Sequence, residues 1–169
     1  MTKIAIQPNA SGTGVFTLTA PNSNTDRTFS LPDATGEVYT SGNILGTVSQ
    51  SGGVPTGAII ERGSNANGEF VKYADGTMIC IRNLPVTITT TETNVYGSTA
   101  GVLNKAIGTG INFPSVFAAT PTVSANPVSN TLRTATVFAR STSNYSFSAY
   151  TERPDTNHTV DIIAIGRWY

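Results

Sequence analysis

The chain has 169 residues, enough for one or two small domains, and its ten basic residues balance ten acidic ones. Charged residues make up only 12% of the sequence, so it has no basic stripe that could neutralise a nucleic-acid backbone or an anionic membrane surface. Nucleic acid is therefore not an expected partner.

The sequence contains no apolar run of the length that a membrane span requires. Its start, MTKIAIQPNASG, places three apolar residues between Lys3 and Gln7, which is too few for the hydrophobic region of a signal peptide. We expect a chain that is made in a host cytoplasm, stays soluble and does not insert into a membrane.

The first forty residues carry two short alternating segments. Phe16 and Leu18 alternate with threonines in VFTLTA, and Phe29 and Leu31 do so in RTFSL, which predicts two half-buried strands joined by loop formers. Such a small β-meander buries too little apolar surface to fold alone. We expect a homotrimer in which these four side chains form the inner faces.

The segment GTVSQSGGVPTG, residues 46–57, has the Gly, Ser and Pro content of a flexible connector. It divides the chain into an N-terminal attachment and trimerisation module at residues 1–45, a linker at 46–57, and a C-terminal module at 58–169.

The C-terminal module is rich in β-branched residues and turn formers, which predicts an all-β fold. The Asp75-Gly76 pair between apolar arms predicts a β-hairpin at residues 69–82. The closest approach to helical periodicity is residues 98–108, where we consider a single helical turn. Further strands are predicted in these segments: LPVTITTT, ATPTVSANPV, TATVFAR, NYSFSAY and TVDIIAIGRWY. Short strands with Pro, Asn and Gly turns suggest an antiparallel sandwich or a partly closed barrel.

Residues for catalysis or metal binding are sparse. The single histidine, His158, lies at a predicted strand start and reads as a loop residue rather than a general base, and the single cysteine, Cys80, reads as a small buried hydrophobe. One His and one Cys do not make a zinc site, and no carboxylate pair or phosphate loop is evident. We therefore expect no enzyme activity, no metal and no cofactor.

Aromatic side chains suggest sugar binding as a second function, because an exposed ring can stack on the apolar face of a pyranose. The candidates are Tyr96, Tyr145, Tyr150, Trp168 and Tyr169. Aromatic residues at alternate strand positions are more often part of a core. The sequence assigns no residue to a glycan contact.

Two groups of segments resemble phage proteins. GVFTLTAPNSNTDRTFSLPDATGEV is similar to a segment that recurs in virion proteins of tailed bacteriophages, especially marine phages and prophages. GSNANGEFVKYADGTMICI, FPSVFAATPTVSA and IAIGRWY resemble the distal knob of phage tail fibres, a β-sandwich similar in appearance to H-type lectins. Together these segments cover 64 of the 169 residues.

The resemblance implies a homotrimeric protein on the virion surface, attached through its N-terminal segment. A connector of about a dozen residues would extend at most roughly 40 Å, which leaves no room for a fibre shaft. We therefore expect a capsid decoration or cement protein, or a head spike, that binds the major capsid protein or another virion protein. The alternative is a tail-fibre tip that binds a glycan of the host surface.

Overall fold

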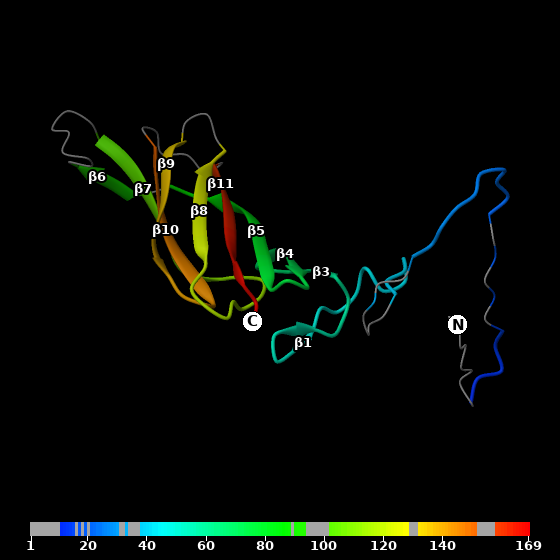
Figure 1. Ribbon diagram of the computed structural model, residues 1–169. Helices are drawn as coiled ribbons and strands as arrows, with labels where there is room; N and C mark the ends of the chain where they lie inside the picture. Colours follow the sequence, from blue (N-terminus) through cyan, green and yellow to red (C-terminus); the bar gives the residue numbers. More distant parts are fainter. Residues whose placement is uncertain are drawn as a thin grey trace. The chain divides into compact units, whose positions relative to one another are not determined.

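The computed structural model describes residues 11–15, 17, 19, 21–30, 33, 38–88, 90–93, 102–128, 132–151 and 158–169. The chain divides into two compact units, residues 1–37 and 38–169. All regular elements of the described residues are β-strands, which confirms the all-β prediction (Figure 1). No helix among the described residues is long and apolar enough to cross a membrane.

The larger unit contains a five-stranded antiparallel sheet with the order β3-β4-β5-β11-β8. Its strands are β3 (Ile60–Asn65), β4 (Gly68–Tyr73), β5 (Thr77–Val86), β8 (Thr122–Pro127) and β11 (His158–Arg167). β4 and β5 form the predicted hairpin around Asp75-Gly76. β11 lies between β5 and β8, in the interior position expected for a strand that is apolar on both faces.

The second sheet of this unit has four antiparallel strands in the order β6-β7-β10-β9. They are β6 (Thr90–Thr93), β7 (Val102–Asn112), β9 (Leu132–Arg140) and β10 (Asn144–Thr151). The presence of β7 shows that the helical turn considered at residues 98–108 is wrong for residues 102–108, which form strand instead. The sheet partners β6 and β10 decide this, because they supply hydrogen bonds to both edges of β7.

The core lies between the two sheets. Met78, Cys80 and Ile162 from the five-stranded sheet and Tyr145 and Phe147 from the four-stranded sheet belong to one buried cluster. On β5 and β11 these side chains occupy alternate positions, as expected for strands with one face on a core. The arrangement is a sandwich of two sheets, one of the two forms that the sequence suggested.

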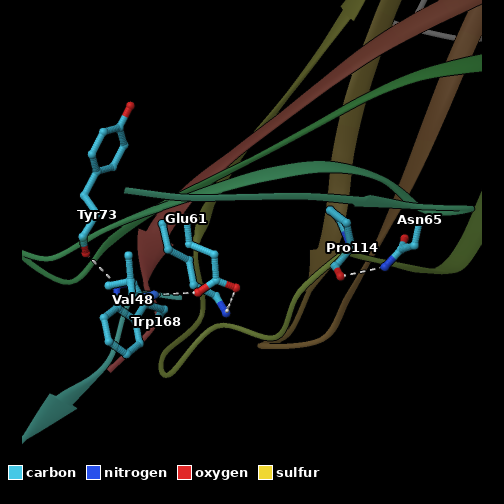
Figure 2. A network of polar contacts seen from close by, with 7 residues as sticks. Val48, Glu61, Asn65, Tyr73, Pro114 and Trp168 are labelled. Carbon is cyan, nitrogen blue, oxygen red and sulfur yellow. Dashed lines mark hydrogen bonds and ion pairs between the residues drawn. The ribbon is translucent and has the colours of Figure 1, made fainter. Parts of the chain in front are cut away.

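Residues 46–57 differ from the flexible linker that their composition predicts. They contain a short hairpin of β1 (Gln50–Ser51) and β2 (Val54–Pro55), and they belong to the unit that begins at Val38. The Val48 side chain is buried, and its backbone NH donates to Glu61 Oε2 at 3.0 Å (Figure 2). Contacts with β3, which composition alone does not reveal, hold this segment in place.

In the smaller unit, Phe16, Leu18 and Leu31 lie outside the described residues. Phe29 is described and is 80% exposed, and residues 27–30 around it form no strand. Among the described residues, the Phe29 side chain is therefore not covered as the meander would require. The inner faces expected for a homotrimer therefore stay a prediction.

Candidate functional site

A groove opens where β4 begins beside β5. β4 pairs with β5 only as far as Ile81, whereas β5 continues to Val86 alongside β11. The groove has a volume of about 460 Å³, within the usual range for sites that hold small molecules. Eight residues line it: Asn65, Ala66, Gly68, Glu69, Ile81, Arg82, Asn83 and Pro85.

The β3–β4 turn forms one wall of the groove. Asn65 Oδ1 accepts a hydrogen bond from the Asn67 backbone NH at 2.8 Å, and Asn65 Nδ2 donates to the Pro114 carbonyl at 2.8 Å (Figure 2). Gly68 has a φ of 124°, and a β-carbon there would collide with the Ile81 carbonyl oxygen. The wall is thus fixed to the loop after β7 and packed closely against β5.

The groove combines polar groups with apolar surface. Glu69 and Asn83 are exposed, and Asn83 Nδ2 donates to Asp161 Oδ1 on β11 at 2.7 Å. Between them the Ile81 side chain is 49% exposed, and Pro85 continues the apolar surface along β5. A carboxylate and an amide beside an aliphatic surface match the hydroxyl groups and C–H faces of a sugar ring.

Arg82 connects this groove to the interior. It lies on β5 between Ile81 and Asn83, and it also lines a second, half-open pocket of about 10 Å³, room for about one water molecule. Tyr145 lines the same pocket, and its hydroxyl makes no hydrogen bond of good geometry among the described residues. Burial raises the pKa of Tyr145, and the nearby Arg82 guanidinium opposes that shift. Arg82 is half-buried.

The aromatic residues suggested by the sequence lie elsewhere. Tyr145 is buried in the core. Trp168 Nε1 donates to the Tyr73 carbonyl at 2.8 Å (Figure 2), and the Tyr169 hydroxyl donates to the Ala74 carbonyl at 3.3 Å, so both hold the C-terminus against the β4–β5 turn. The Lys105 Nζ lies 5.8 Å from the centre of the Tyr150 ring, and Tyr96 is outside the described residues.

The sequence did not identify the groove residues, and only their turn and edge positions could have indicated them. Asn65, Ala66 and Gly68 belong to GSNANGE, which the sequence identified only as a loop. Pro85 on the exposed edge of a strand is the clearest signal, because proline is confined to such edges in sheets.

The other candidate residues show no catalytic arrangement. His158 is the first residue of β11, at the strand start that the sequence predicts, and it is buried in the strand rather than placed in a loop. Cys80 is buried as predicted, and burial raises its pKa to about 11 despite opposing effects of Ser115 and Lys72. Among the described residues no three His, Cys, Asp or Glu side chains lie close enough together to hold a metal ion.

Comparisons with known proteins give a limited result. No family model matches the chain, and no curated protein matches it. An N-truncated R1-type pyocin tail fiber has 16% identity and a TM-score of 0.40, with 61% of this chain and 82% of the fiber fragment covered.

A longer C-terminal fragment of the R1 pyocin fiber of P. aeruginosa has 15% identity and a TM-score of 0.42. The match covers 83% of this chain but only 40% of that fragment. At these scores the likeness carries no inference about what this chain binds.

Proposed function

We propose that residues 38–169 are a receptor-binding knob on the surface of a phage particle, and that the groove beside β5 binds a saccharide of the host cell surface. The observation that carries this proposal is the groove itself, with Glu69 and Asn83 next to the exposed Ile81. The resemblance of GSNANGEFVKYADGTMICI to tail-fibre knobs supports a virion location, and five of the eight residues that line the groove belong to this segment. The proposal assigns no catalytic role to the chain.

The groove residues have separable roles in this proposal. Glu69 accepts hydrogen bonds from sugar hydroxyls, and Arg82 donates hydrogen bonds to them. Asn83 offers its amide while Asp161 holds its orientation. Ile81 and Pro85 pack against the C–H groups of the ring, as apolar surfaces do in saccharide sites.

A lipopolysaccharide array probed with the full-length chain tests this function. We expect binding to a subset of purified bacterial lipopolysaccharides, weakened about tenfold or more by Asn83→Ala or Glu69→Ala, because each substitution removes a polar contact. Ser124→Ala, a polar exposed position on β8 outside the groove, is the matched control and should bind as the wild type does. Absence of binding to every lipopolysaccharide by a folded chain would contradict the proposal.

Capsid decoration is the second candidate. The sequence favours it, because the predicted connector of about a dozen residues is too short to form a fibre shaft. In this function a homotrimer attached through residues 1–37 would reinforce the shell by mass action, because it binds only the assembled state. Particles without the protein would then burst at lower temperature and still adsorb to cells.

A further inference from the structure

The outer face of the five-stranded sheet carries a continuous group of aliphatic side chains. The outward positions of β5 and β11 pair Ile81 with Ile163 and Ile79 with Ile165, and Val71 of β4 is paired with Ile79. We call these five residues the aliphatic face. Ile81 and Ile165 are each 49% exposed, and Ile163 is 37% exposed.

The four-stranded sheet has a different outer face. Its interior strand β10 carries Ser146 and Ser148 at the positions that alternate with the core residues. The neighbours of Ser148 on this sheet are Ile107 of β7 and Thr136 of β9. Both serines are buried, whereas the outward isoleucines of the five-stranded sheet lie side by side on adjacent strands and are exposed. Contiguous exposed apolar surface of this kind typically marks an interaction site.

The charges around the aliphatic face are balanced. The outward positions of the five strands carry two basic residues, Arg62 and Arg167, towards one end of the strands, and two acidic residues, Glu69 and Asp161, towards the other. A partner of strong net charge of either sign would meet repulsion at one of these ends. A second copy carries both signs itself and can meet each charge with its opposite.

We infer that the aliphatic face is an interface between copies of this chain. The copies bury the central isoleucines against each other, with the charged residues at the rim, which is the usual anatomy of a protein interface. This inference names a contact between two antiparallel copies in the C-terminal unit, distinct from the homotrimer that the sequence predicts, and it does not depend on saccharide binding in the groove. The groove shares Ile81 with this face and borders it at Glu69, so a second copy and a bound saccharide would compete for the Ile81 side chain.

Thiol protection in the full-length chain tests the inference. Ile165→Cys places a thiol within the aliphatic face, and Ile107→Cys, at a position 53% exposed on the other sheet, is the matched control. The buried Cys80 is common to both variants. We expect a polyethylene-glycol maleimide to react with the first thiol about tenfold more slowly than with the second, because a neighbouring copy limits access.

Light scattering on the same samples gives the mass. Samples in which the Ile165→Cys thiol is protected should have a mass that is a multiple of 17.7 kDa. Protection of the thiol should disappear at dilutions where the measured mass is that of one chain. Equal reaction rates in the two variants would overturn the inference. So would protection that persists in a monomer, since residues of the same chain would then cover the face.

A lysine substitution provides a second variant. Ile165→Lys should shift dissociation of the oligomer to at least about tenfold higher concentration, because it would bury an unpaired charge in the interface. Ile107→Lys should leave dissociation unchanged. Similar behaviour of the two lysine variants would also overturn the inference.

Discussion

The Asp75-Gly76 turn shows how a local sequence signal becomes a specific interaction. Asp75 Oδ1 accepts a hydrogen bond from the Thr77 backbone NH at 2.8 Å, and Gly76 adopts a φ of 92°, which favours glycine. The hydrogen bonds from the Thr77 backbone and side chain lower the pKa of Asp75 below its ordinary value of 3.8. This carboxylate therefore stabilises the fold only while it is ionised.

Asp75→Ala should lower the free energy of unfolding at pH 7 by less than about 1 kcal/mol, because the turn is exposed to solvent. A lowered carboxyl pKa contributes stability above the unfolded value and loses it as the pH falls through the folded value. The difference between wild type and variant should therefore narrow between pH 5 and pH 3, roughly the range around the unfolded value. Urea titrations followed by fluorescence of Trp168, the single tryptophan, would measure it.

Asp26→Ala is the control for this titration, because Asp26 lies in the unit of residues 1–37. It should leave the unfolding detected by Trp168 unchanged at both pH values. A difference between Asp75→Ala and wild type that is the same at pH 3 and pH 7 would show that the carboxylate charge plays no part.

His158 and Cys80 show how far the burial of a single residue can be predicted from its neighbours in the sequence. A cysteine within the apolar run TMICI is predicted to be buried, and it is. His158 follows a polar stretch at a predicted strand start, and its pairing with Val86 makes it the first residue of β11. Burial of that imidazole depends on a strand seventy residues away, which local sequence does not reveal.

At the scale of elements, strands with their own alternation or turn were predictable. β4, β5, β10 and β11 carry clear apolar patterns, and their predicted ranges agree with the structure to within a few residues. β7 contains two glycines and a lysine in VLNKAIGTGIN, and its pattern is ambiguous until β6 and β10 supply its hydrogen bonds. Pairing with neighbouring strands, rather than the local sequence pattern, therefore makes this segment a β-strand.

The structure of residues 46–57 also depends on partners elsewhere in the chain, here through polar contacts. Glu61 accepts a hydrogen bond from the Val48 NH and lies 3.6 Å from Lys72 Nζ, so one carboxylate joins this segment to β3 and β4 (Figure 2). Further backbone bonds join Gly46 to Ile60 and Ala58 to Thr47. A composition rich in Gly, Ser and Pro predicts flexibility only where such partners are absent.

Glu61→Ala should release residues 46–57 without unfolding the sandwich. We expect amide hydrogen exchange at Val48 to become about tenfold faster or more, since a hydrogen bond to a charged acceptor is lost. Exchange in β5 and β11 should not change. Glu69→Ala, which removes an exposed carboxylate on the neighbouring strand β4, is the control. Unchanged exchange at Val48 would contradict the role given to Glu61.

At the scale of the whole molecule, the groove could not be predicted from any single motif. It arises because β4 begins only beside Ile81 while β5 continues to Val86, and because the β3–β4 turn is tied to Pro114, forty-nine residues further along the chain. The sequence suggested aromatic residues for sugar binding, whereas the structure uses Trp168 and Tyr169 to hold the C-terminus. A site formed at the ends of strands can be predicted only when the register of the sheet is known.

Adsorption of phage particles to host cells tests the proposed receptor-binding function most directly. Particles that carry Asn83→Ala should adsorb about tenfold more slowly than wild type, since the groove would lose a polar contact, while particles that carry Ser124→Ala should adsorb normally. Heat resistance of the heads should be the same in all three. Normal adsorption of the Asn83→Ala particles, together with heads that burst at lower temperature when the protein is absent, would contradict receptor binding and favour capsid decoration.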